Sequence, residues 1–198
     1  MKKINLFFIA ALAIFLFSCG NPQKKAISEY CNCLNSILTD SIYSYEIATI
    51  IEKKCYDSLI LKNKSLSEDK EFIDGFYKNE QIIKLQDQIK EKIKDNVQTI
   101  LTKYPFTTNL DNYYQIHKFI FDGKIVKYSV WQMDLRGSYE KNIESRTYTV
   151  SAEKNGKTYI EMETSEGKSK IYEFGKNKDN NYYLDGPNSR FFAQKEKK

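Results

Sequence analysis

Apolar side chains return every three or four residues in two stretches near the start of the chain, which is the spacing of one helix face. The first stretch predicts a helix over residues 26–38, and the second predicts a helix over residues 43–61. The polar segment Thr39-Asp40-Ser41 between them is typical of a turn. A connection this short favours an antiparallel helical hairpin.

A longer apolar stripe predicts a further helix over residues 79–103. Glu and Lys fill most of its other positions, as on a solvent-facing helix surface, and Pro105 ends the pattern. Between this helix and the hairpin, residues 63–69 predict a loop and residues 69–76 predict a short helical turn. The stripe consists of Ile82, Leu85, Ile89, Ile93, Val97, Ile100 and Leu101.

Beyond residue 108 the pattern changes to short stretches rich in aromatic and β-branched residues, which predict strands. Asp122-Gly123 and Asn155-Gly156 suit two-residue hairpin turns, because such turns need positive φ angles. Residues 134–142 are predicted to form the one longer loop of this region. The predicted strands cover residues 113–121, 124–133, 146–154, 157–164, 168–174, 181–184 and 190–193.

Helices followed by consecutive strands predict an α+β fold. We expect a helical region over residues 26–104 and an antiparallel β-meander over residues 105–198, with a half-barrel as one form of the sheet. Rings occur on both faces of the predicted strands. One face is expected to pack on the long helix, and the other to be covered by curling of the sheet or by a partner.

The composition is that of an ordinary globular protein, with 41% apolar and 29% charged residues. The net charge of +5 falls to +3 without Lys2 and Lys3, which lie close to the start of the chain. The basic residues form no stripe in the sequence, so we do not expect the protein to bind nucleic acid.

The first 20 residues have the layout of a secretory signal. Lys2 and Lys3 precede an apolar run from Leu6 to Phe17, and the small residue Ser18 follows it. A helix over this run would span roughly 18 Å at about 1.5 Å per residue. Because the core of a bilayer is about 30 Å thick, the run predicts a cleaved signal and not a transmembrane helix.

The end of this segment, Leu16-Phe17-Ser18-Cys19, resembles the lipobox of bacterial lipoproteins, and the resemblance covers residues 1–20 only. It implies a signal peptide over residues 1–18, lipidation of the Cys19 thiol and a tether over residues 19–25. The lipid would make a membrane one partner of the protein. Gly20, in place of the aspartate that retains such proteins at the inner membrane, favours the outer membrane, facing the periplasm.

Three cysteines follow the lipobox, and export to an oxidising compartment favours a disulfide between two of them. A hairpin centred near Tyr43 places Cys31 opposite Cys55, whereas a centre at Ser44 places Cys33 there. Cys31 lies within the apolar stripe of the first helix, and Cys33 lies about 200° from it around the axis. We therefore expect a Cys31–Cys55 disulfide, with Cys33–Cys55 and three reduced cysteines as alternatives.

Few residues suggest catalysis or metal binding. His117 is the sole histidine and no Gly-x-Ser-x-Gly elbow accompanies it, so a structural role is expected. Glu161 and Glu163 are expected to lie on one strand face, roughly 6.6–7 Å apart. The two catalytic acids of a glycosidase can have this separation, but we expect a solvent-facing pair without a catalytic role. Cys31 and Cys33 point to opposite sides of a helix and are poorly placed to share a zinc ion. We expect no enzyme, no metal and no cofactor.

The aromatic residues of the strands are the main indication of function, because Tyr and Trp are enriched at binding interfaces. They can equally form core and cross-strand pairs in a small sheet. We expect a lipid-anchored, non-enzymatic binding or assembly protein of the cell envelope, with a protein partner there. The alternative is a carrier of a small apolar ligand in a curled, lipocalin-like sheet. The candidate binding residues are Tyr128, Trp131, Tyr148 and Tyr159.

Overall fold

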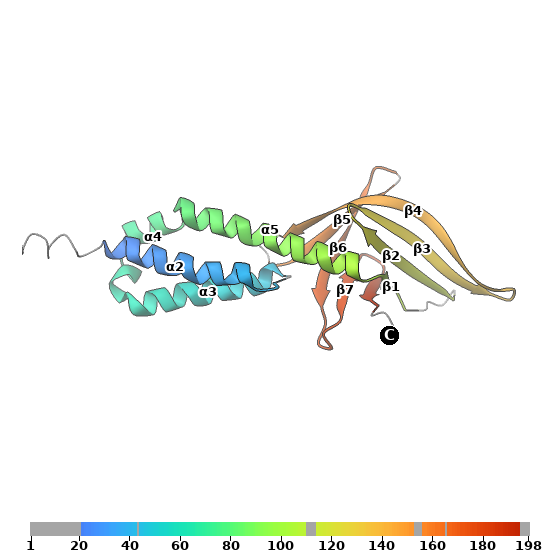
Figure 1. Ribbon diagram of the computed structural model, residues 1–198, viewed down its shortest axis with the longest axis horizontal. Helices are drawn as coiled ribbons and strands as arrows, with labels where there is room; N and C mark the ends of the chain where they lie inside the picture. Colours follow the sequence, from blue (N-terminus) through green and yellow to red (C-terminus); the bar gives the residue numbers. More distant parts are fainter. Residues whose placement is uncertain (1–20, 43, 110–113, 153–155, 165, 195–198) are drawn as a thin grey trace, which may run out of the picture. The chain divides into compact units, whose positions relative to one another are not determined.

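The computed structural model describes residues 21–42, 44–109, 114–152, 156–164 and 166–194 (Figure 1). Helices precede a consecutive series of antiparallel strands, so the predicted α+β class is confirmed. The helical elements are α2 (Pro22–Thr39), α3 (Tyr45–Lys62), the short 3-10 helix η1 (Lys64–Ser67), α4 (Lys70–Phe76) and α5 (Glu80–Lys103). The strands are β1 (Phe106–Thr107), β2 (Gln115–Asp122), β3 (Ile125–Asp134), β4 (Gly137–Ala152), β5 (Thr158–Glu163), β6 (Ser169–Lys176), β7 (Tyr182–Asp185) and β8 (Arg190–Ala193).

The described residues form two compact units. A helical unit contains residues 21–39 and Ile51–Asp87, and a barrel unit contains Asp40–Ile50 and the chain from Gln88 onward. Helices α3 and α5 each contribute residues to both units. None of the helices among the described residues is long and apolar enough to cross a membrane.

Helix α2 begins at Pro22, inside the predicted tether of residues 19–25. Proline is favoured in the first turn of a helix, because its φ angle is already helical and no partner for an N–H is needed there. The side chain of Asn21 accepts a hydrogen bond from the Gln23 N–H at 3.0 Å, as a helix cap does. These local signals start the helix before its first buried residue, Ala26.

The core of the helical unit is centred on Phe76 of α4, which is buried. The ring of Tyr30 from α2 lies 4.8 Å from the Phe76 ring, and the ring of Tyr56 from α3 lies 5.4 Å from it. Asp69 caps α4 by accepting a hydrogen bond from the Phe72 N–H at 3.0 Å. One aromatic side chain of α4 therefore connects both helices of the hairpin.

The disulfide joins Cys33 to Cys55, and Cys31 is a free, buried thiol. The prediction of a Cys31–Cys55 disulfide is therefore wrong, and the alternative through Cys33 is the pair that forms. The prediction assumed that the apolar stripe of α2 faces α3 alone. Because Tyr30, beside Cys31, packs on Phe76 of α4, the stripe faces a core that α4 shares. Cys33, outside the stripe, is the cysteine that approaches α3.

The strands close into a barrel in which each strand pairs with the next and β1 pairs with β8. The sheet is therefore a fully closed barrel, whereas the sequence predicted a meander with a half-barrel as one form. Closure depends on β1, which pairs Phe106 with Phe119 of β2 on one side and with Ala193 of β8 on the other. A two-residue strand directly after Pro105 shows no alternation, so the sequence pattern does not reveal it.

Strands β3 and β4 form a long hairpin that extends beyond the neighbouring strands (Figure 1). The prediction of a loop over residues 134–142 is wrong, because β4 begins at Gly137 and pairs with β3 from there to Thr147. The pairing shifts between Tyr128 and Ser129, which leaves Ile143 as an extra residue in a bulge. Residues 137–143 are exposed on both faces, so they lack the apolar alternation by which a strand is recognised.

One end of the barrel is covered by the parts of α5 and of residues 40–42 and 44–50 that belong to the barrel unit. The Gln98 amide donates a hydrogen bond to the Gly123 carbonyl in the β2–β3 turn at 3.2 Å. The Glu46 N–H donates one to the Gly156 carbonyl between β4 and β5 at 2.7 Å. Alternate connections of an up-and-down barrel lie at the same end, so these contacts cover that end.

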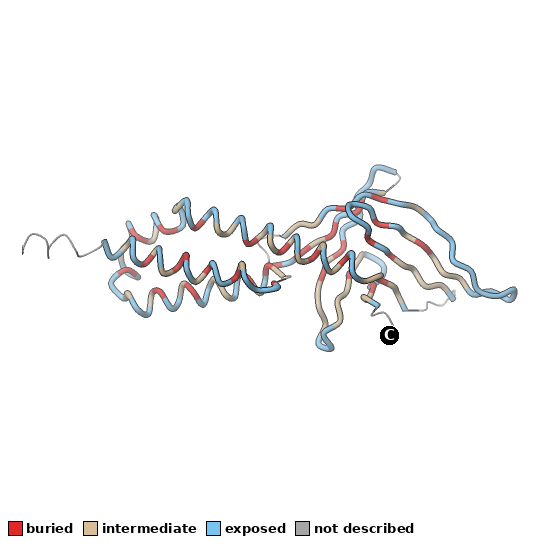
Figure 2. The backbone as a smooth tube through the Cα atoms, in the orientation of Figure 1, coloured by how far each residue is buried: buried red, intermediate tan, exposed pale blue. Residues whose placement is uncertain are grey.

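Inward-facing side chains fill the covered half of the barrel. Figure 2 shows buried residues alternating with exposed ones along the strands, as expected where one face of a sheet is a core. Phe106 packs edge-on against Phe121, and Phe121 packs in the same way against Tyr148. The residues of this core that are least exposed are Phe106, Phe119, Val126, Ile160, Met162 and Leu184.

Candidate functional site: a pocket in the barrel

The pocket of interest lies toward the end of the barrel opposite to the covered one. It has a volume of about 310 Å³. The β7–β8 connection borders it, and in this topology that connection lies at the other end from the β2–β3 and β4–β5 connections. The lining residues are His117, Phe119, Tyr128, Arg146, Lys170, Tyr172, Pro187, Asn188, Ser189 and Phe191.

Strand alternation brings these side chains to one place. Residues two apart on a strand share a face, so His117 follows the inward orientation of Phe119 on β2. The register then places Tyr128 of β3 opposite Phe119. Gly186 allows the β7–β8 connection to approach, because a Cβ atom there would overlap the ring of Tyr172.

Aromatic rings form the apolar wall of the pocket. Phe119 is 1% exposed and stacks on Phe191 with ring centroids 4.4 Å apart. Its ring also lies 5.3 Å from the Tyr128 ring and 5.5 Å from the Tyr172 ring. Four rings from four strands therefore present a continuous apolar surface that can hold a flat or compact group.

Arg146 brings a buried cation to the pocket wall. The residue is 8% exposed, and its guanidinium lies over the Tyr128 ring, 5.3 Å from the centroid. It forms an ion pair with Glu144, two residues earlier on the same strand. The Arg146 Nε–H and the Glu144 Oε2 atom are buried and have no hydrogen-bond partner among the described residues. A buried charge is costly unless it is paired and fully hydrogen-bonded. The two unsatisfied atoms of this ion pair can therefore each form a further hydrogen bond.

The remaining polar side chains of the pocket include two phenols, an imidazole and a lysine ammonium. The Tyr128 hydroxyl and the His117 Nδ1 atom are hydrogen-bonded at 2.6 Å. Burial raises the pKa of Tyr128 and also that of Tyr172, so both phenols are protonated at neutral pH. Lys170 is exposed and lies at the edge of the pocket. The lining residues include two cations and no carboxylate.

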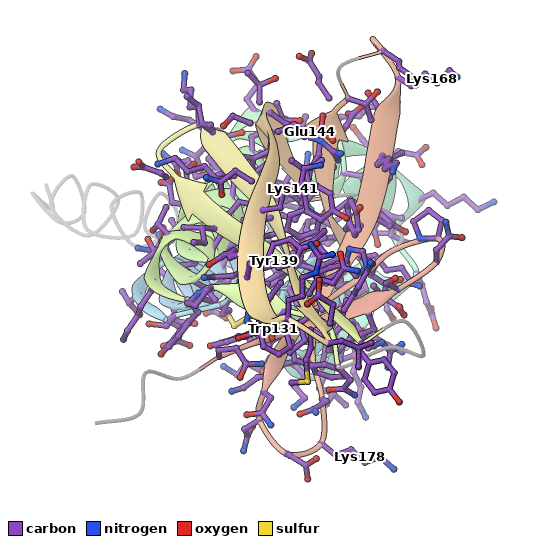
Figure 3. The ribbon with its side chains drawn as sticks, turned by 90° about the vertical axis from the view of Figure 1, so that its right-hand side faces the viewer. Trp131, Tyr139, Lys141, Glu144, Lys168 and Lys178 are labelled. Carbon is purple, nitrogen blue, oxygen red and sulfur yellow. A yellow bond between two sulfur atoms is a disulfide. The ribbon has the colours of Figure 1, made fainter. Side chains whose placement is uncertain are left out.

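The four predicted binding residues do not come together in the structure. Tyr128 lines the pocket. Tyr148 is buried toward the covered end, where its hydroxyl donates a hydrogen bond to the Gly123 carbonyl at 2.7 Å. Trp131 is three residues from Tyr128, and Tyr159 lies beside the buried Ile160, so both face the opposite side of their strands. Figure 3 labels Trp131 near the hairpin residues Tyr139, Lys141 and Glu144. Ligand or partner binding by these four residues stays a prediction.

Sequence reasoning missed the cation of the pocket. Arg146 opens the predicted strand over residues 146–154, where its residue type alone does not distinguish it from a surface arginine. The useful signal is its spacing from Glu144 and Tyr148, because residues two apart on a strand share a face. A charged pair on the face of a core tyrosine indicates a polar site inside the sheet.

The other residues with catalytic potential are dispersed. Glu163 accepts a hydrogen bond from the Thr147 hydroxyl at 2.6 Å, and both Glu161 and Glu163 are exposed. His117 lies in the pocket but is bonded to Tyr128 there. Within the described ranges no three His, Cys, Asp or Glu residues are grouped to hold a metal ion.

A second, more open depression of about 700 Å³ lies in the helical unit. Most of its lining side chains are exposed, and it contains no buried charge. We therefore regard the barrel pocket as the candidate site, although it is smaller. The depression is lined by Lys24, Ile27, Ser28, Lys78, Asn79, Glu80 and Gln81.

No protein-family model, curated protein or solved structure matches the chain. Its function must therefore be argued from the geometry of the pocket.

Proposed function

We propose that the protein binds a small ligand in the barrel pocket and acts as a ligand-binding or carrier protein of the cell envelope. The observation that carries the proposal is the ion pair between the buried Arg146 and the half-buried Glu144 at the wall of an aromatic pocket of about 310 Å³. Small-molecule sites combine an apolar lining with a few convergent polar groups that fix orientation. A barrel interior that served packing alone would be filled by side chains, as it is around Ile160 and Leu184.

Two environment-sensitive dyes with related ring systems test the proposal: the anion 1-anilinonaphthalene-8-sulfonate and the neutral N-phenyl-1-naphthylamine. At least one should bind with one-to-one stoichiometry. Ser189 is exposed at the edge of the pocket, so Ser189→Trp should obstruct it and weaken binding roughly tenfold or more. Ser138→Trp, on the exposed hairpin, is the matched control and should leave affinity unchanged. Failure to bind either dye, or equal affinities of the two variants, would contradict the proposal.

Attachment to a membrane through Cys19 is a second part of the proposal. The lipobox-like residues lie outside the described residues, so the proposal is supported by the sequence alone. Cys19→Ala should give a chain without acyl mass, either released from the membrane or uncut. Cys31→Ala is the control and should retain the lipid. The attachment proposal fails if Cys19→Ala still reaches the mature mass with acyl chains, as measured by intact mass spectrometry.

A protein partner in the envelope is a second candidate function, favoured by the β3–β4 hairpin. Met133, Leu135, Tyr139 and Ile143 are exposed on it, and Leu135 is 108% exposed at its tip. The partner that fits is an extended segment of an envelope protein that pairs with the β4 edge. A photo-cross-linker at Lys141 should give a discrete adduct that the same group at Lys178, on the β6–β7 connection, does not give. Equal yields at both positions would argue against this function.

A further inference from the structure

We infer that the ligand of the barrel pocket is a compact acid, with an anionic group beside an apolar ring system. This inference rests on the proposed function and names the chemical class of its ligand. The charges that line the pocket are those of Arg146 and Lys170. Because no carboxylate is among the described lining residues, the pocket favours an anion over a cation.

Glu144 does not reverse this preference. Its carboxylate is paired with Arg146, so the two charges cancel within the wall, and Glu144 does not itself line the pocket. Lys170 at the edge is then a cation without a compensating carboxylate among the lining residues. The ion pair also keeps the Arg146 charge stable while the pocket is empty, since an unpaired buried charge would be costly.

The donors of the pocket suit an anionic oxygen. The Arg146 Nε–H has no partner among the described residues, and a charge-assisted hydrogen bond to an oxyanion is stronger than a neutral one. The Tyr172 phenol adds a protonated hydroxyl, because burial raises its pKa. An anion placed beside Arg146 can therefore receive several hydrogen bonds in a partly desolvated site.

The size of the pocket limits the apolar part of the ligand. A volume of about 310 Å³ is close to the lower end of the range for small-molecule sites, roughly 300–1,000 Å³. Phe119, Phe191 and Tyr172 offer ring faces and edges at stacking distances. These features favour a compact ring-bearing acid over a long-chain lipid.

The experiment compares the affinities of the anionic and the neutral dye. The wild-type protein should bind the anion about tenfold or more tightly, and added salt should reduce that preference. Lys170→Gln should weaken binding of the anion severalfold and leave the neutral dye unaffected. Lys168→Gln is the matched control, because Lys168 is exposed near the same strand but does not line the pocket.

The contribution of Arg146 is tested with its partner changed as well, since Arg146→Gln alone would leave the half-buried Glu144 unpaired. The double variant Glu144→Gln/Arg146→Gln keeps hydrogen-bonding groups in the wall without charge. It should lower the preference for the anionic dye severalfold, and Lys170 should retain the remainder of that preference. The inference is overturned, with the proposed function intact, if the neutral dye binds as tightly as the anion in the wild type or if the double variant keeps the full wild-type preference. Absence of pocket binding by both dyes would overturn both.

Discussion

Cys31 and Cys33 are two positions apart on α2, but one is a buried thiol and the other forms the disulfide. The difference follows from their angular positions on the helix, because two residues correspond to about 200° of rotation. The sequence predicts both orientations correctly relative to the apolar stripe. It does not predict that α4 covers the stripe, and that contact decides which cysteine reaches Cys55.

This assignment makes a prediction about stability. Cys33→Ala should lower the free energy of unfolding by about 2–4 kcal/mol, because it removes a cross-link between residues 22 apart. Cys31→Ala removes only a small buried side chain and should cost about 1 kcal/mol. Denaturant unfolding without reductant measures both. A reductant should weaken Cys31→Ala but not Cys33→Ala, and the reverse pattern would restore the Cys31–Cys55 assignment.

Glu140 gives the barrel unit a dependence on pH. Its carboxylate accepts a hydrogen bond from the Ser129 hydroxyl at 2.6 Å and one from the Lys118 ammonium at 3.3 Å, and these bonds lower the pKa of Glu140. An unfolded glutamate titrates near pH 4.3. The stabilisation is therefore present above about pH 4.3 and is lost as the pH falls through the lower pKa of the folded state.

Glu140→Gln should accordingly reduce stability at neutral pH and have little effect at about pH 3. The carboxylate is 43% exposed, so solvent screening limits the effect at neutral pH to less than about 1 kcal/mol. Denaturant unfolding of both proteins from pH 7 to pH 3 measures the difference. A constant difference over this range would show that the charge of Glu140 is not responsible.

At the scale of elements, the helices were predictable and the edges of the sheet were not. Helix α5 ends at Lys103 as predicted, because its apolar stripe is regular and Pro105 stops it. The β3–β4 hairpin was missed because main-chain pairing, and not burial, holds its outer part. Its charged residues carry no periodic signal, so a loop and an exposed strand look alike in the sequence.

The outer part of β4 should be the part of the barrel that opens most easily. Within the described residues β4 pairs with β5 only from Tyr148 to Ala152, so residues 138–147, apart from the bulged Ile143, pair with β3 alone. Their N–H groups that point away from β3 should exchange with solvent roughly 100-fold faster than those of β5. Strand β5 is the internal control, because β4 and β6 both pair with it. Equal protection would indicate that another segment covers the β4 edge.

At the scale of the whole molecule, closure of the barrel forms the pocket, because it brings together strands that are far apart in the sequence. Arg146, Tyr172 and Phe191 come from three strands that only the closed sheet brings together. The sequence predicted most of these strands but not their closure, because closure depends on a two-residue strand and on long-range pairing. The pocket could therefore not be predicted from local patterns.

The contact between Gly156 and Glu46 at the covered end of the barrel can be tested by mutation. Gly156 has a φ angle of +86°, and a Cβ atom there would lie 3.2 Å from the Glu46 Cβ atom. Gly156→Ala should destabilise the protein by about 1–3 kcal/mol, through backbone strain and this close contact. Gly167→Ala, also at a positive φ but with open space around it, is the control for strain alone and should cost less. Equal losses in thermal unfolding would mean that the Glu46 contact is unimportant.

Because Cys31 is a free thiol that unfolding exposes, one unfolding event can change the disulfide pairing of the protein permanently. In the folded state burial raises the pKa of Cys31 and shields it from reaction. Once the helices separate, its thiolate can attack the Cys55 sulfur, forming a Cys31–Cys55 bond and releasing Cys33 as a thiolate. The exchanged isomer cannot rebuild the same core, so melting at alkaline pH should show hysteresis. The proportion of exchanged molecules would then record how often the population has been heated past its transition.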